Sequence, residues 1–527
     1  MTKLEEKHEM MNSFDAKLQK WDVEDRAFWE VTGKYIAYKN LWISIGCLLL
    51  AFCVWLMWSI ITVQMKNLGF PFDDGQLFTL TAVAGLTGAT LRIPSSFLVA
   101  ISGGRNINFV YTGLLIIPAL FTGIALQTKE TPYFVFVILA ALSGIGGGLF
   151  APSMSNISFF FPKKIQGLAL GLNAGLGNLG VSVMQVVLPI VMSFSLFGLL
   201  AGSGFPLPTA IGEKSAGSLV YIQNAGFVWV PFLAIFSLLA LTYMNNLPIH
   251  NIGNNFFAIL KAFGPLLVGF TSSLIGLYLL LILKLNMLIV LPITVILTML
   301  LMRISPQGVR KSLDNQFQIF KNKHTWIMTV LYTMSFGSFI GFSAALPLFI
   351  KIIFGVLPDG SVNPEAPNPF HYAWLGPLVG SICRPVGGWI SDKISGSKVN
   401  HINTFIMILA TCGVAYFVKQ AQILQNPEHL FLPFLILFLV LFITTGIGNG
   451  SNFRMVPMIF EPKLAGPVLG WISAIAAYGA FVVPNVIGAQ VKAHTPEYAL
   501  YGFAIFYSFC LFLNWWFYRR KQAEVEC

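Results

Sequence analysis

Long apolar blocks separated by short polar segments follow one another along most of the chain. Each block is roughly 20 residues long, which is the length that an α-helix needs to cross about 30 Å of hydrocarbon. The pattern therefore predicts an all-α integral membrane protein. The twelve main blocks lie at about 40–64, 76–100, 108–127, 133–160, 167–197, 226–245, 325–354, 371–391, 402–420, 430–459, 467–490 and 498–518.

A further apolar stretch, at about 258–302, separates the first six blocks from the last six. It is interrupted near Lys284 and Asn286. Two short spans would leave the topology of the later blocks unchanged, so we predict an inserted hairpin and twelve plus two spans in total. One bent segment at the membrane interface is the alternative.

Composition narrows the class of protein. Apolar residues make up 56% of the 527 residues and charged residues only 10%, whereas about a quarter of an ordinary soluble domain is charged. This balance excludes a soluble enzyme of this size. The net charge of +11 does not indicate nucleic acid, because the basic residues lie between apolar blocks and form no RRM, helix-turn-helix or finger pattern. The six cysteines show no CxxC spacing, so we predict no metal, no cofactor and no disulfide.

The distribution of charge orients the chain in the membrane. Basic residues gather in the N-terminal tail and in alternate loops, above all at 303–324, while the other loops hold only scattered lysines. By the positive-inside rule, both termini and the 303–324 segment are predicted to be cytoplasmic. A cleavable signal peptide is not expected, because the first 39 residues are polar and carry seven Lys or Arg.

The two halves of the chain resemble each other. At an offset of about 299 residues, Gly167, Gly171 and Gly180 match Gly466, Gly470 and Gly479, and at about 292 residues Gly88-x3-Arg92 matches Gly380-x3-Arg384. Duplicated halves place a binding site between two bundles near the bilayer midplane. The predicted domains are a cytoplasmic tail 1–39, a six-helix bundle 40–246, the inserted hairpin 247–302, a cytoplasmic linker 303–324, a second six-helix bundle 325–518 and a cytoplasmic tail 519–527.

Arg92 and Arg384 lie deep within two apolar blocks. At 1.5 Å per helical residue, each guanidinium is roughly 12–15 Å from the predicted cytoplasmic boundary, about half of the hydrocarbon thickness. An arginine at that depth costs at least about 2.5–3.5 kcal/mol and cannot lose its proton. Since no Asp or Glu lies in the core of a predicted span, the two cations predict an anion site. Snorkelling to the interface, or pairing with a carboxylate, is the alternative interpretation.

The chemistry of guanidinium favours a flat oxyanion. Its planar fork of donors binds such an ion through two bonds, where lysine offers a point charge. Nitrate and nitrite are small, flat and monovalent. A dianion such as phosphate would balance two arginines better on charge alone, so composition leaves both classes open.

Other polar and small residues lie in the same spans. The glycines of 167–180 either allow close helix packing or let the backbone approach an anion. Asn173 and Asn178 either orient an anion through their amides or serve packing. Tyr332 either donates its hydroxyl to the ligand or bonds a neighbouring helix.

Four segments point to one family. They are WDVEDRAFWEVTGKYIAYKNLWISIGCLLLAFCVW, MSNISFFFPKK, GLALGLNAGLGNLGVSVMQ and FGSFIGFSA. Together they resemble the nitrate/nitrite porter family of the major facilitator superfamily, specifically its bacterial NarK-type members. The resemblance covers nearly the whole chain except about 246–305 and includes two nitrate signatures, at 167–180 and 466–484. It implies a major facilitator fold and transport of nitrate and nitrite.

The resemblance also implies roles for individual residues. Arg92 and Arg384 would bind the substrate, Tyr332 would hydrogen-bond the anion, and Phe150 and Phe336 would sandwich the flat ion. The signatures would contain Asn173 and Asn178 together with Gly167, Gly171, Gly175, Gly177, Gly180, Gly470 and Gly479.

The chain departs from the family pattern in three respects. The second signature has Ala476 and Ala480 where the family is richer in glycine, which predicts a stiffer helix. The inserted hairpin is absent from twelve-span members. Arg454 stands where an uncharged polar residue is usual, and we interpret it as a boundary or gate residue.

The sequence therefore predicts an inner-membrane carrier of a bacterium that exchanges nitrate for nitrite by alternating access. We expect a monomer in the lipid bilayer with no required protein partner and no nucleic-acid ligand. Proton-coupled nitrate symport and a non-transporting anion sensor are the alternatives. A membrane enzyme would need His, Asp, Glu or Cys constellations, and the seven histidines lie at ends or in loops.

Overall fold

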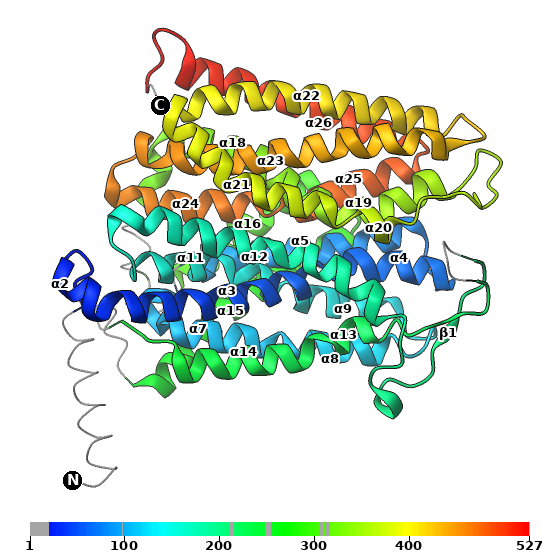
Figure 1. Ribbon diagram of the computed structural model, residues 1–527, viewed down its shortest axis with the longest axis horizontal. Coiled ribbons are helices and arrows are strands. Elements are labelled where there is room, and N and C mark those ends of the chain that lie inside the picture. The colour runs from blue at the N-terminus through cyan, green and yellow to red at the C-terminus, as the bar shows by residue number, and fades with distance from the viewer. Residues whose placement is uncertain are drawn as a thin grey trace.

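The computed structural model describes residues 21–96, 98–210, 215–247, 254–304, 310, 317–525 and 527. Its long helices run side by side along one axis (Figure 1). The short helix α2 (Arg26–Phe28) and the C-terminus lie at one end, here termed the tail end. Strands β1 (Phe205–Pro206) and β2 (Leu219–Val220) pair at the opposite end, here termed the loop end.

The first half of the chain forms helices that match its six predicted blocks, several of them interrupted by a residue or a turn. The interruption at Met57, for example, separates two helices within the first block. The helices are α3 (Lys34–Leu56), α4 (Trp58–Leu68), α5 (Asp74–Ser95), α6 (Val99–Ser102), α7 (Gly104–Leu114), α8 (Ile116–Ala125), α9 (Tyr133–Ser143), α10 (Ile145–Gly148), α11 (Phe150–Ser158), α12 (Lys163–Val191), α13 (Asn224–Phe227) and α14 (Trp229–Tyr243).

The second half is built in the same manner. One π-helical turn, η5 (Thr333–Gly337), lies between two helices of its first block. The α-helices of this half are α18 (Lys323–Tyr332), α19 (Ser338–Gly355), α20 (Pro369–Tyr372), α21 (Leu375–Ile394), α22 (Gly396–Ala421), α23 (Phe431–Ile459), α24 (Pro462–Ala476), α25 (Gly479–Lys492) and α26 (Pro496–Asn514).

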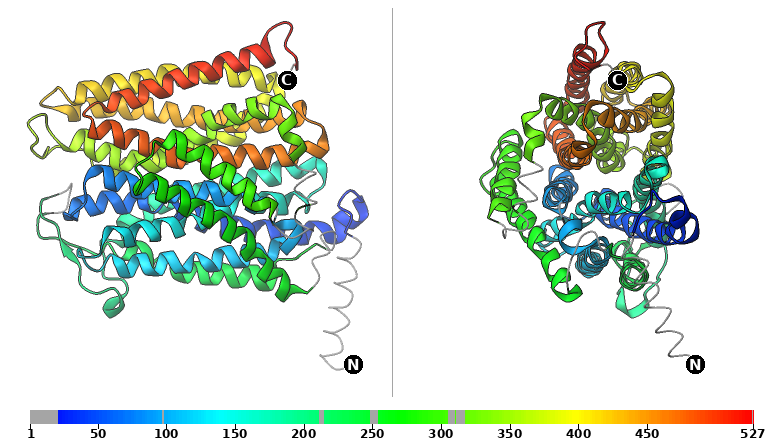
Figure 2. Two further views of the ribbon diagram at one scale, coloured as in Figure 1. Left: turned by 180° about the vertical axis from the view of Figure 1, so that it is seen from behind. Right: turned by 90° about the vertical axis from the view of Figure 1, so that its left-hand side faces the viewer.

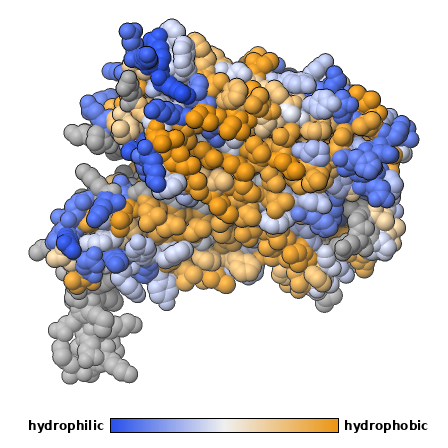
Figure 3. Space-filling model, turned by 45° about the horizontal axis from the view of Figure 1, so that its top comes forward, coloured by the Kyte–Doolittle hydropathy of each residue, from blue (hydrophilic) through white to orange (hydrophobic). Residues whose placement is uncertain are grey.

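The apolar character of these helices fits a bilayer. In the described part of the chain, twelve helical stretches are long and apolar enough to cross a membrane. One of them, Phe256–Leu281, belongs to the insertion, and the block predicted at 371–391 is also helical as α21. Apolar side chains form a broad band across the middle of the molecule, with hydrophilic residues gathered at its ends (Figure 3). The predicted all-α membrane fold is confirmed.

The inserted segment folds as two helices, α15 (Asn255–Leu281) and α16 (Met287–Arg303), along one side of the molecule (Figure 2). Helix α15 packs against α16 and against α5, α6 and α7 of the first half. Close approach to α5 depends on Gly269, because a Cβ there would lie 2.7 Å from Cδ2 of Leu91. The 17 residues of α16 extend about 25 Å, and its crossing of the membrane stays a prediction.

The two halves meet along pairs of helices. Helix α5 packs on α24 and α25, α12 packs on α21, and α4 packs on α19. Glycine permits the tightest contact, since a Cβ on Gly85 of α5 would lie 2.3 Å from the carbonyl oxygen of Ala480. Near the loop end, Ser182 donates a hydrogen bond to the carbonyl of Trp374 at 2.5 Å, and Gln185 donates to that of Ser343 at 2.9 Å. Helix α12 is therefore joined toward the loop end to both α21 and α19.

Candidate functional site

Arg92, on α5, is fully buried and is bonded to both halves of the protein. Its Nε donates a hydrogen bond to the carbonyl oxygen of Gly147, in the first half, at 3.0 Å. Its Nη1 donates to the carbonyl oxygen of Ser473, in the second half, at 3.1 Å. Within the described residues Nη2 has no hydrogen-bond partner, so this donor is available to a ligand.

Aromatic rings surround the same guanidinium. Its central carbon lies 4.6 Å from the ring centroid of Phe150, 5.4 Å from that of Trp55 and 5.5 Å from that of Phe336. Aromatic faces attract cations, and the attraction is stronger away from water. The rings therefore offset part of the cost of burying this charge.

Arg384, on α21, is held within the second half alone. Its Nη2 donates a hydrogen bond to the hydroxyl of Tyr332 at 3.1 Å, and its guanidinium lies 4.6 Å from the ring centroid of Phe453. The residue is 5% exposed, and Nη1 has no partner among the described residues. Each arginine thus presents one buried terminal NH2 group that has no hydrogen-bond partner among the described residues.

A row of near-parallel rings connects the two arginines. Phe453 stacks on Tyr332 with centroids 5.0 Å apart, Tyr332 on Phe336 at 5.6 Å, and Phe336 on Phe150 at 6.1 Å. The π-helical turn η5 follows Tyr332 directly, and its wider winding accompanies the 5° angle between the rings of Tyr332 and Phe336. The row begins beside Arg384 and ends beside Arg92.

The electrostatics of this region favour an anion. Neither guanidinium takes part in an ion pair within the described residues, whose ion pairs lie elsewhere. The charges of Arg92 and Arg384 repel each other. Two unpaired cations in a buried, aromatic-lined region are stabilised by a bound anion.

The signature asparagines bond elsewhere. Asn173 donates its Nδ2 to the hydroxyl of Ser153 at 2.8 Å, on the helix that begins at Phe150. The side-chain oxygens of Asn173 and Asn178 are buried without a hydrogen-bond partner among the described residues. Within the described part of the chain, neither amide hydrogen-bonds an arginine, and Asn173 instead bonds the helix that begins at Phe150.

The signature glycines fall into two groups. A Cβ on Gly177 would lie 2.6 Å from Cδ2 of Leu48, and one on Gly180 would lie 2.2 Å from a backbone oxygen of α3, so these two permit helix packing. A Cβ on Gly171 or Gly175 would meet nothing within 4 Å.

The second signature repeats the packing role. A Cβ on Gly479 would lie 2.0 Å from the carbonyl oxygen of Gly337, whereas one on Gly470 would lie 3.8 Å from Ser96. Gly167 lies within α12. Packing therefore accounts for Gly177, Gly180 and Gly479, and open space adjoins Gly171 and Gly175.

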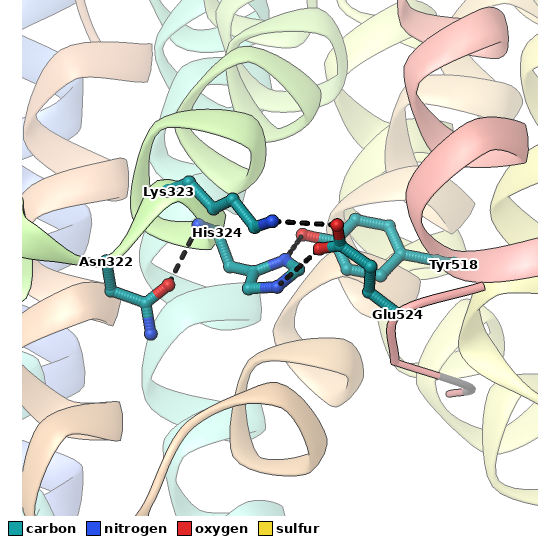
Figure 4. Close-up of polar contacts among 5 residues, drawn as sticks. All are labelled: Asn322, Lys323, His324, Tyr518 and Glu524. Carbon is teal, nitrogen blue, oxygen red and sulfur yellow. Dashed lines mark hydrogen bonds and ion pairs between the residues drawn. The ribbon is translucent and has the colours of Figure 1, made fainter.

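Two other polar regions lie apart from the arginines. At the tail end, Glu524 accepts a hydrogen bond from Lys323 at 2.7 Å and lies 3.5 Å from Nε2 of His324, whose Nδ1 is 3.1 Å from the hydroxyl of Tyr518 (Figure 4). The bond from Lys323 lowers the pKa of Glu524.

At the loop end, a pocket of about 510 Å³ is lined by Gln64, Asn67, Val186, Pro189, Ile190, Met192, Ser193, Leu207, Val220, Asn368, Phe370, His371 and Trp374. Neither region includes Arg92 or Arg384.

Sequence reasoning missed several partners of the arginines. No spacing singles out Phe453 among 47 phenylalanines, or Trp55 among 12 tryptophans. The carbonyls of Gly147 and Ser473 carry no side-chain signal at all. Arg454, interpreted as a boundary or gate residue, pairs with Asp392 at an exposed position within the second half.

The chain is similar in sequence, over nearly its whole length, to known transporters. The chain is 37% identical over 509 residues to the probable nitrate/nitrite antiporter NarK2 of Thermus thermophilus, covering 96% of this chain and 97% of that protein. It is 37% identical over 531 residues to the nitrate/nitrite transporter NarU of Escherichia coli K12, covering 97% of each. No family model matches the chain.

Solved structures support the fold. The chain is similar to a D-xylose-proton symporter with a TM-score of 0.58 at 13% identity, over 91% of this chain and 97% of that one. It is similar to the partially occluded inward open conformation of the xylose transporter XylE with a TM-score of 0.57 at 12% identity, over 91% and 97%. At such low identity these similarities establish the architecture alone.

Proposed function

This chain belongs to the nitrate/nitrite transporter family of the major facilitator superfamily, and on that premise we propose that it exchanges nitrate and nitrite across a bacterial inner membrane. The family and fold predicted from the sequence are confirmed. The observation that carries the substrate assignment is the pair of buried, unpaired guanidiniums, one from each half, linked by stacked rings. Alternating access exposes a site between the halves to one side of the membrane at a time.

In the proposed site, nitrate or nitrite accepts hydrogen bonds from the free Nη2 of Arg92 and the free Nη1 of Arg384. Bonds from charged donors to a small oxyanion are short and strong, and their geometry suits a planar ion. Tyr332 orients Arg384 through its hydroxyl and lies close enough to both cations to help bind the anion.

The proposed sandwich between Phe150 and Phe336 places a condition on the structure. Their ring centroids are 6.1 Å apart with planes 27° from parallel. A flat ion between two rings needs about 7 Å, because each contact between non-bonded atoms takes about 3.5 Å. The rings must therefore separate by about 1 Å on binding, or the anion must lie at their edges.

The proposed exchange mechanism follows from the free-energy cost of closing the carrier over two unpaired arginines. Burying an uncompensated ion costs several kcal/mol even after relaxation, and a bound anion offsets that cost at both arginines. The loaded carrier then changes conformation faster than the empty one. Vesicles loaded with nitrite, with nitrate or with neither, and offered labelled nitrate outside, test this proposal. Uptake that needs internal anion supports exchange, and equal uptake into empty vesicles contradicts it.

Proton-coupled nitrate symport is the second candidate, and one observation favours it. Arg92 already has two carbonyl acceptors and three aromatic faces within the protein, so its charge is partly compensated without a ligand. That compensation lowers the free-energy cost of the conformational change that the carrier makes without a bound anion. In the same vesicles, uptake into the anion-free interior driven by an imposed proton gradient would establish symport. A sensor without transport is excluded by flux of either kind.

We also propose the orientation. Basic residues at the tail end, including Arg303, Lys398, Arg519 and Arg520, support a cytoplasmic location of this end by the positive-inside rule. The domain boundaries predicted above, and the monomeric state, belong to the same proposal. A fluorescent protein fused to the C-terminal end, which matures in the cytoplasm but not in the periplasm after Sec export, tests the orientation. Absence of fluorescence from inserted protein would place the tail end outside.

A further inference from the structure

Three buried tyrosines share one chemical arrangement, in which the phenol bonds a single serine or threonine hydroxyl. Tyr111 bonds Ser95 at 2.5 Å, and both residues belong to the first half. Tyr507 bonds Ser338 at 2.7 Å, and both belong to the second half. The third pair is the hydroxyl of Tyr478 with that of Thr90 at 2.8 Å, and it crosses from one half to the other.

The direction of the third bond is fixed by its neighbours. Thr90 donates its single hydroxyl proton to the carbonyl oxygen of Leu86 at 2.8 Å, one turn earlier in α5. Its oxygen therefore accepts the proton of Tyr478. Thr90 is fully buried and Tyr478 is 5% exposed, so water does not compete for this bond.

The position of the pair connects it to the candidate site. Thr90 precedes Arg92 by two residues on α5, and Tyr478 follows Ser473 by five residues at the turn between α24 and α25. The same two segments are joined by the bond from Nη1 of Arg92 to the carbonyl of Ser473. Two hydrogen bonds therefore join these two segments across the boundary between the halves, one from Arg92 to the carbonyl of Ser473 and one from Tyr478 to Thr90.

We propose that Tyr478 is a positioning residue for transport, whose hydroxyl ties the α24–α25 turn to α5. The hydrogen bond between Tyr478 and Thr90 keeps Nη1 of Arg92 bonded to the carbonyl of Ser473, and so leaves Nη2 free to bond the anion. Because alternating access moves one half against the other, a bond across the boundary also stabilises the conformation that contains it. This proposal rests on the proposed function for its effect on nitrate, and its effect on conformation stands without it.

The variants follow from the three matched pairs. Tyr478→Phe and Thr90→Val each remove the crossing bond with little change of volume, and Thr90→Ser keeps the hydroxyl. Tyr111→Phe and Tyr507→Phe remove an equally buried hydroxyl from a pair inside one half, and they are the controls. If Tyr478→Phe does not fold, Thr90→Val carries the test alone.

Two measurements separate positioning from a purely structural role. The first is the KM and maximal rate of nitrate exchange in vesicles. The second is the rate at which a maleimide labels Ser182→Cys from the loop end, with Cys383, Cys412 and Cys527 replaced by serine. Ser182 is 4% exposed and bonds Trp374 across the boundary, so its labelling reports separation of the halves at that end.

A single net hydrogen bond corresponds to a change of roughly two- to tenfold in an equilibrium. We expect Tyr478→Phe and Thr90→Val each to raise the labelling rate and the KM by about that factor. Their combination should add nothing further, because both remove one bond. Thr90→Ser, Tyr111→Phe and Tyr507→Phe should each label at the rate of the Ser182→Cys protein that carries none of these further changes.

Labelling of Tyr478→Phe at the rate of Tyr507→Phe would overturn the proposal, as would additive effects of Tyr478→Phe and Thr90→Val. The labelling assay needs no nitrate flux. If the unaltered protein fails to exchange nitrate while labelling still responds to Tyr478→Phe, the proposed substrate is wrong and the positioning role of Tyr478 stands.

Discussion

The two halves of the protein hold their arginines in different ways. Arg92 bonds backbone carbonyls of both halves and lies among three rings, whereas Arg384 bonds one side-chain hydroxyl and lies over one ring, all within the second half. The signature helices differ too, since α12 is continuous over 29 residues while α24 and α25 are separated at Ala477 and Tyr478. The two halves therefore carry the same cation with different supporting contacts. Arg92 is coupled to the contact between the halves, and Arg384 is held by contacts within the second half.

The largest expected effect on transport comes from replacing each arginine by lysine, which keeps the charge but changes the geometry of the donors. Arg92→Lys keeps the charge but cannot bond two carbonyls and an anion with a planar fork, and bonds to charged groups contribute about 1.5–3 kcal/mol each. We expect the ratio of the maximal rate to the KM of nitrate exchange to fall by about 100-fold or more. Arg384→Lys should also abolish most transport, with a smaller loss because one bond supports that arginine. Near-normal flux in both variants would show that the arginines are structural.

A smaller effect tests the local support of Arg384. Tyr332→Phe removes the hydroxyl that accepts from Nη2 of Arg384 but leaves the ring in its stack. We expect the KM for nitrate to rise by roughly tenfold, because a bond to a charged group is lost. Labelling of Ser182→Cys should stay unchanged, since the Tyr332 bond lies within one half. A changed labelling rate would remove the distinction between the two arginines.

Two glycines of the first signature helix, Gly180 and Gly171, are expected to differ in their effect on thermal stability. Gly180→Ala places a methyl group against the backbone of α3, where overpacking costs about 1–3 kcal/mol, while Gly171→Ala meets open space. We expect the thermal midpoint of purified protein to fall by several degrees for Gly180→Ala and to stay constant for Gly171→Ala. Equal midpoints for the two variants would contradict the packing role of Gly180.

The smallest effect concerns the rings beneath the arginines. Phe453→Leu removes the aromatic face that lies under Arg384 among the described residues, whereas Phe150→Leu leaves Arg92 with the rings of Trp55 and Phe336. Cation–π contacts contribute about 0.5–2 kcal/mol, so we expect the KM to rise by roughly two- to tenfold for Phe453→Leu. If Phe150 also contacts the anion, Phe150→Leu will have the larger effect, and the sandwich rather than the cation will explain it.

The sequence by itself determined the features that local chemistry controls. The length and apolarity of each block predicted the helices and their order, because a backbone in hydrocarbon must satisfy its own hydrogen bonds. The depth of Arg92 and Arg384 within their blocks identified the cations, since charge is costly at that depth whatever surrounds it. The inserted stretch at 258–302 was recognisable as apolar, but its packing on α5 was not.

Only the tertiary structure decided which groups meet those cations. The carbonyls of Gly147 and Ser473 are backbone atoms that every residue carries, and Phe453 resembles many other phenylalanines until folding brings it beneath Arg384. The bond between Thr90 and Tyr478 joins residues 388 positions apart. Such partners depend on how two separately formed bundles dock, and docking is set by packing across long sequence distances, which residue spacing does not encode.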